Sequence, residues 1–153
     1  MALDRPSAGI LALRIAIGVF FVFEGLGKIR WFSDPSILAG QLHGWLQAAP
    51  ANSITHVYLS KVAMPGVAVF ARLVPLGEIA SGLAMIAGLW TPLFAFIAFF
   101  MALNFHIGSG ALFKYSFLTN GYGLPVLGST LALALAGGRR RATKLRVKSE
   151  SKK

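Results

Sequence analysis

The sequence predicts an all-α integral membrane protein: a four-helix bundle with an amphipathic helical segment outside the membrane between spans one and two. Composition is the first reason, since 56% of the 153 residues are hydrophobic and only 13% are charged, where a soluble domain carries about a quarter charged residues. The second reason is a series of long apolar stretches separated by polar, glycine-rich or proline-containing segments. The third is charge placement, because eight of the fifteen Lys and Arg residues lie within 139–153.

The first predicted span covers about residues 8–28. Its apolar run is too long for a signal peptide and is interrupted by Arg14 and Glu24, so we expect it to be retained in the protein. Lys28 and Trp31 follow the run and are typical anchors at a membrane interface.

The connection between spans one and two is long and contains its own helix signal. Asp34 followed by Pro35 is typical of a helix start. The apolar residues that come next repeat on one helical face, namely Leu38, Leu42, Trp45 and Leu46. This pattern predicts an amphipathic helix over 35–49 that lies on the membrane surface.

The remaining spans are predicted over about 66–89, 93–107 and 118–136. Pro75 lies inside the second span and should kink it. Trp90-Thr91-Pro92 predicts a tight turn, with Thr91 capping the third span and Pro92 opening it. Such a short turn makes spans two and three antiparallel neighbours.

The basic tail over 139–153 is predicted to be disordered and to orient the bundle. Four spans place both termini on one side, and the positive charges mark that side as cytoplasmic. The tail can contact anionic lipid head groups. It is too short to form the folded basic surface that a nucleic-acid partner requires, so we expect no nucleic-acid partner.

Spans one and two each carry one arginine and one glutamate, Arg14 with Glu24 and Arg72 with Glu78. Charges inside a membrane are costly, so they usually form ion pairs or mark a site. A rise of about 1.5 Å per residue places Glu24 level with Arg72, and Arg14 level with Glu78. We therefore expect these two crosswise pairs, with Lys28, four residues after Glu24, as a competing partner. Two interpretations stay open: structural pairing only, or a ligand pocket lined by one or more of these charges.

Asn104 and His106 end the third span and form the other polar pair. Inside a bundle they could hydrogen-bond a quinone carbonyl, and His106 alone is a weak candidate ligand for a haem or pigment metal. The alternative is a polar helix end that faces water. The chain has no cysteine, which excludes disulfides, Cys-held clusters and thiol chemistry within it.

Taken in order, short motifs in the sequence resemble the DoxX/DoxD family. The first-helix motifs are Arg14-x3-Gly18, Phe20-Phe21-x-Phe23 and Gly25-x2-Lys28. The second helix and its turn carry Glu78-x3-Gly82-x5-Gly88 and Trp90-Thr91-Pro92, and Asn104 and Asn120 mark the end of helix three and the entry to helix four. The resemblance covers about residues 10–136.

The resemblance implies a four-helix protein of a bacterial or archaeal cytoplasmic membrane. The long outer segment is similar to that of the DoxD branch, which resembles the membrane subunit of thiosulfate:quinone oxidoreductase. It implies a redox subunit that binds quinone beside other membrane or periplasmic redox subunits and is not catalytic alone. Glu78 and Glu24 would then donate protons, and Arg14 and Arg72 would hold an anionic oxygen of the substrate or quinone.

The alternative is a non-catalytic accessory or anchoring subunit of a larger respiratory or photosynthetic complex. In that case a phenylalanine-rich face of the third span would pack against partner helices or lipid: Phe94, Phe96, Phe99 and Phe100.

Overall fold

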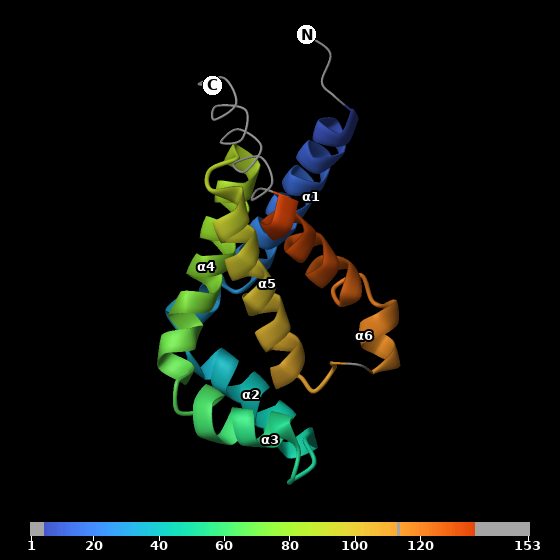
Figure 1. Cartoon of the computed structure of the whole chain (residues 1–153). Helices are drawn as coiled ribbons and strands as arrows, with labels where there is room; N and C mark the ends of the chain where they lie inside the picture. The colour runs from blue at the N-terminus through green and yellow to red at the C-terminus, as the bar shows by residue number, and fades with distance from the viewer. Residues whose placement is uncertain (1–4, 113, 137–153) are drawn as a thin grey trace, which may run out of the picture.

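The computed structural model describes residues 5–112 and 114–136, and within these ranges every regular element is a helix (Figure 1). In chain order the elements are α1 (Arg5–Gly27), the 3-10 helix η1 (Ile29–Phe32), α2 (Ser36–Ala48), α3 (Ile54–Tyr58), the π-helix η2 (Leu59–Ala63), α4 (Val67–Ala87), α5 (Thr91–Gly108) and α6 (Tyr115–Thr119). A last helix, Leu124–Ala136, ends the described part of the chain. The predicted all-α fold is confirmed.

Three of the helices are long and apolar enough to cross a membrane: α1 from Ala8 to Gly27, α4 and α5. They match the first three predicted spans closely, and many of their large apolar side chains are exposed, as lipid contact requires. The last helix begins at Leu124, later than the predicted 118. The side chain of Asn120 accepts a 2.7 Å hydrogen bond from the Tyr122 N–H, which stabilises a turn and separates α6 from that helix. The basic tail predicted over 139–153 lies outside the described residues.

In Figure 1, α1, α4, α5 and the last helix form the body of the bundle, and α2 and α3 lie together at one end. The helix predicted between the first two spans is present as α2, with Leu38 and Leu42 buried against Trp31 and Leu59. Pro35 takes the N-cap position, and Asp34, one residue before it, accepts a 3.0 Å hydrogen bond from the Ser36 N–H. The hydrogen bonds from Ser36 also lower the pKa of Asp34.

The interface between α1 and α4, which we call the glycine seam, brings two helix backbones into direct contact. A Cβ atom placed on Gly82 would lie 2.6 Å from the Gly18 carbonyl oxygen, and one placed on Gly18 would lie 2.8 Å from the Gly82 oxygen. About two turns further on, a Cβ atom on Gly25 would lie 2.8 Å from the Pro75 oxygen. Only glycine fits at these positions, so the seam fixes how α1 and α4 are rotated and spaced.

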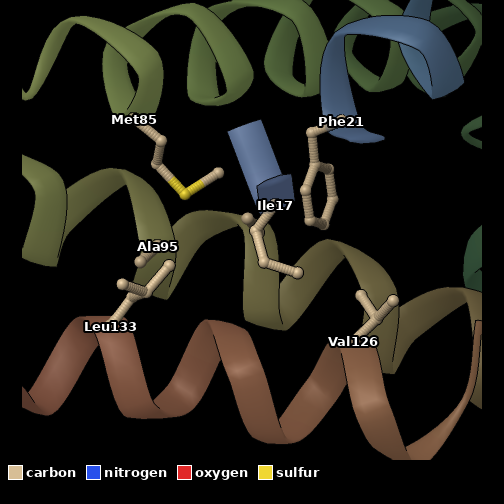
Figure 2. Packing of buried hydrophobic residues seen from close by; sticks show 7 residues of the cluster. Ile17, Phe21, Met85, Ala95, Val126 and Leu133 are labelled. Carbon is tan, nitrogen blue, oxygen red and sulfur yellow. The ribbon is translucent and has the colours of Figure 1, made fainter. Parts of the chain in front are cut away.

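The apolar core joins this pair of helices to α5 and the last helix. Figure 2 shows Ile17 and Phe21 from α1, Met85 from α4, Ala95 from α5 and Leu133 from the last helix directed into one layer. Met85 and Ala95 have no exposed surface. The core thus holds four helices together on the side of the bundle near the α4–α5 turn.

The α4–α5 turn is as tight as predicted, but its caps differ from the prediction. Gly88 ends α4 with φ of 74°, and Trp90 takes the N-cap position of α5 with φ of 43°. Thr91 is already helical, so the prediction that it caps the third span was wrong. A reversal this short needs left-handed backbone on both sides of Leu89, and this conformation places Trp90 at the helix start.

Candidate functional site

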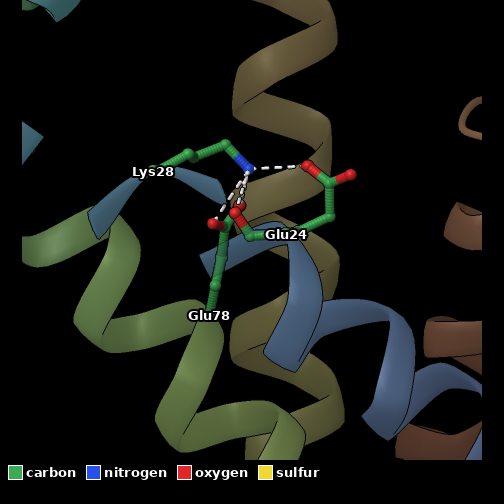
Figure 3. Close-up of polar contacts among 3 residues, drawn as sticks. All are labelled: Glu24, Lys28 and Glu78. Carbon is green, nitrogen blue, oxygen red and sulfur yellow. Dashed lines mark hydrogen bonds and ion pairs between the residues drawn. The ribbon is translucent and has the colours of Figure 1, made fainter. Parts of the chain in front are cut away.

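Three ionisable side chains meet where α1 passes α4, and we call Glu24, Lys28 and Glu78 the acid–base cluster (Figure 3). The Lys28 ammonium lies 2.7 Å from Glu24 Oε2 and 2.9 Å from each Glu78 oxygen. The Lys28 and Glu78 side chains are only 13% and 11% exposed, and Glu24 is 35% exposed. One ammonium therefore holds two carboxylates, and the cluster carries a net charge of −1 when all three groups are ionised.

The predicted crosswise pairs, Glu24 with Arg72 and Arg14 with Glu78, were wrong. Arg72 is exposed and donates a 2.6 Å hydrogen bond to the Ala68 carbonyl of its own helix. Depth in the membrane follows from residue counting, but helix rotation does not, and the glycine seam turns Arg72 outward. The competing partner, Lys28, pairs with both carboxylates.

Arg14 lies at the opposite end of the glycine seam, against Gly88, the C-cap residue of α4. A Cβ atom on Gly88 would lie 2.6 Å from the Arg14 Nη1 atom. The guanidinium is thus beside the carbonyl end of α4, where the helix dipole favours positive charge. Its Nε atom is buried and makes no hydrogen bond to the described residues. In this position Arg14 stabilises the end of a helix.

A cavity of about 350 Å³ opens beside the acid–base cluster, bounded by α1, α5, α6 and the last helix. This volume is in the usual range for sites that bind small organic molecules. Aromatic rings form much of its wall: Phe20, Phe21, Phe105, Phe117 and Tyr122. Glu24, Lys28 and Glu78 all line it, so the cavity combines flat apolar surfaces with a group of charges.

His106 lines the same cavity and is only 7% exposed. Its Nε2 atom lies 2.9 Å from the Tyr122 carbonyl oxygen. A carbonyl oxygen only accepts, so Nε2 carries the proton. The other ring nitrogen, Nδ1, is buried and has no hydrogen-bond partner within the described chain. Such an atom is costly unless something bonds to it.

A second, smaller cavity of about 100 Å³ lies under α2 and α3. Asn104 and Tyr58 line it, and the Tyr58 hydroxyl donates to the Asn104 side-chain oxygen. Glu78 lines both cavities, so its carboxylate lies at the wall that they share. Polar groups therefore lie on both sides of the acid–base cluster.

The structure brings together three of the six predicted site residues. Glu24, Glu78 and His106 share the larger cavity and Asn104 lines the smaller one, whereas the two arginines, described above, line neither of these cavities. Lys28 was expected only as a competing partner and not as a site residue, although its position four residues after Glu24 indicates that the two side chains can meet on one helical face. No group of three or more potential metal-ligating side chains was found among residues 5–112 and 114–136.

These features define a polytopic helical membrane protein with an ionisable, aromatic cavity inside its bundle. The chain matches the DoxX family over residues 9–109, and it belongs to that family. Neither the curated proteins nor the solved structures give a match.

Proposed function

We propose that this protein is a membrane subunit of a redox complex and that it binds a quinone in the cavity beside the acid–base cluster. The observation that carries the proposal is the coincidence of aromatic walls with Glu24, Lys28, Glu78 and His106 around one space of about 350 Å³. A quinone supplies a flat ring that fits aromatic walls, and it takes up two electrons and two protons when it is reduced. Residues that exchange protons beside a ring-shaped pocket suit that chemistry.

The fit rests on the residues present. Glu24 is the most exposed member of the acid–base cluster, so it can exchange protons with water at the cavity mouth. Glu78 is more buried, and Lys28 links the two carboxylates. We propose Glu78 and Glu24 as the proton donors toward the bound ring, with Lys28 holding both carboxylates in place.

The finer proposal is that electrons originate from thiosulfate, and it rests on the likeness to the DoxD branch. The chain has no cysteine, so thiol or Cys-held cluster chemistry would come from a partner subunit. Thiosulfate-dependent quinone reduction in native membranes, compared between wild type and Glu78→Gln, tests this step. A normal rate with the variant as the only copy would contradict it.

Copurification tests the quinone site itself. The full chain, extracted anaerobically from native membranes, should retain quinone and hydroquinone that chromatography identifies, and Glu78→Gln should reduce the summed amount at least about tenfold, because the variant loses a carboxylate that can accept from a hydroquinone hydroxyl group. Gln47→Glu, on the exposed surface of α2, is the matched control and should retain the wild-type amount. Quinone-free wild-type protein would count against the proposal.

A second candidate function is anchoring of a larger complex, and the outer face of α5 favours it. Phe96 and Phe100 are each 49% exposed, and their ring centroids are 4.7 Å apart. Such a face can contact a partner helix as well as lipid. If Phe96→Ala with Phe100→Ala releases the chain from a complex on native gels, while Glu78→Gln leaves the activity of that complex intact, anchoring is the better account.

A further inference from the structure

The buried donors of the larger cavity wall already have partners, and its remaining buried polar atoms accept hydrogen bonds; from this we infer that the site prefers the hydroquinone form of its ligand over the quinone form. The inference rests on the proposed function, because it concerns the same cavity. It adds which chemical form the cavity recognises and which residues decide this.

Lys28 is the only cation among the buried groups of the cavity wall, and its donors are already in use. An ammonium has three N–H donors. Four acceptor atoms already surround the Lys28 Nζ: the Glu24 carbonyl oxygen at 3.2 Å, Glu24 Oε2 at 2.7 Å and the two Glu78 oxygens at 2.9 Å. No N–H group of Lys28 is left for a ligand carbonyl.

His106 presents an acceptor for a different reason. Because Nε2 donates to the Tyr122 carbonyl, a neutral ring has its lone pair on Nδ1. The orphaned Nδ1 atom is therefore a hydrogen-bond acceptor in a residue of the cavity wall.

The carboxylates add further acceptors. Figure 3 shows one oxygen of Glu24 directed toward Lys28 and the other directed away from it. The other side chains of the wall that could donate are Ser109, Ser116, Asn120 and Tyr122. The Ser109 hydroxyl already donates to the His106 carbonyl oxygen, and the other three residues are exposed, so they lie at the rim and not in the interior.

A quinone offers two carbonyl oxygens, which only accept, whereas a hydroquinone offers two hydroxyl groups, which donate. In the interior of this cavity the quinone oxygens would meet acceptors, whereas the hydroxyl groups could donate to the carboxylates and to the unpartnered His106 Nδ1 atom. One such bond changes affinity by about tenfold. Preference for the reduced form also makes the bound quinone easier to reduce, by about 30 mV for each tenfold in a two-electron couple.

The test compares three ligands that share one ring system: 1,4-dihydroxynaphthalene, 1,4-naphthoquinone and 1,4-dimethoxynaphthalene. Their affinities for the purified full chain are measured by anaerobic calorimetry. We expect the dihydroxy compound to bind about tenfold more tightly than the quinone, and the dimethoxy compound to bind no better than the quinone. The dimethoxy arm needs no variant, so it remains informative if a variant fails to fold.

His106→Phe should reduce the preference to about twofold, because it removes an acceptor from the cavity wall. His43→Phe is the matched control, since His43 is exposed on α2, and it should keep the full preference. Equal or tighter binding of the quinone in wild type would overturn the inference and leave the proposed function standing. Failure of all three compounds to bind would remove the proposed site and the inference with it.

Discussion

The two sides of α1 pack in opposite ways. Toward α4, the glycine seam brings two backbones together with no room for a methyl group. Toward α5 and α6, large aromatic side chains hold the elements apart and leave a cavity of about 350 Å³. The comparison shows how a small bundle keeps an open site without losing its shape, because the rigid side fixes the positions of the charged groups that face the open side.

The acid–base cluster lies where these two sides meet. Glu24 comes from the last turn of α1, and Lys28 directly follows that helix. Glu78 comes from α4, only three residues after Pro75, whose carbonyl lies at the seam. A change in the seam should therefore disturb the cluster as well as the packing.

The largest effect is expected from closing the seam. In Gly82→Ala the new methyl group would meet the Gly18 carbonyl, a backbone atom that cannot move aside, so we expect a loss of at least about 3 kcal/mol and little folded protein. Gly9→Ala is the control, because a Cβ atom there meets nothing within 4 Å. Fluorescence-detected size exclusion and thermal melting measure the difference. Equal melting of the two variants would show that the seam is looser than described.

The next largest loss of stability is expected from a change in the acid–base cluster. Lys28→Met leaves two carboxylates without their shared cation, and breaking a buried pair in this way costs about 3 kcal/mol. Lys61→Met, which removes an exposed lysine from η2, should change the melting temperature very little. Equal melting temperatures for the two lysine variants would contradict the role given to Lys28 in the cluster.

A smaller effect separates the two arginines. Arg14→Ala removes a charge from the carbonyl end of α4 and should cost about 1 kcal/mol. Arg72→Ala removes only a bond within an exposed turn and should stay within about 0.5 kcal/mol of wild type. Melting of both variants in the same detergent decides the order, and a larger loss for Arg72→Ala would contradict it.

The smallest change in stability is expected at the start of α2, which belongs to neither of the two interfaces of α1. The pKa of Asp34 is lowered in the folded state by hydrogen bonds from Ser36, so its contribution to stability is present at neutral pH and fades as the pH falls below about 4. Asp34→Ala should melt slightly below wild type at pH 7, and the gap should shrink toward pH 3. A gap that widens in acid would rule out this role.

Much of the fold could be predicted from residue patterns, because apolar length and turn residues are local properties. The three long spans, α2 and the tight α4–α5 turn were predictable in this way. The start of the last helix was missed because the Asn120 turn interrupts an otherwise apolar stretch.

The site was less predictable, since it depends on helix rotation. Glu24 and Glu78 were identified as candidates from the cost of a charge inside a membrane, and His106 as a polar residue at the end of a span. Lys28 was named as a competing partner of Glu24, but its pairing with Glu78 was not predicted. Residue counting gives the height of Arg72 and not its direction, and the direction follows from glycine contacts such as that between Gly18 and Gly82. The shared role of Lys28 needs the same three-dimensional information.

Filling the cavity tests the central claim most directly. Ala102 lines the cavity from α5, so Ala102→Phe should occupy the space where a ring would bind, while Ala132→Phe adds the same bulk on the exposed side of the last helix. The account predicts saturable binding of 1,4-dihydroxynaphthalene to wild type and to Ala132→Phe, and at least about tenfold weaker binding to a folded Ala102→Phe variant. Undiminished binding to that filled variant would contradict it.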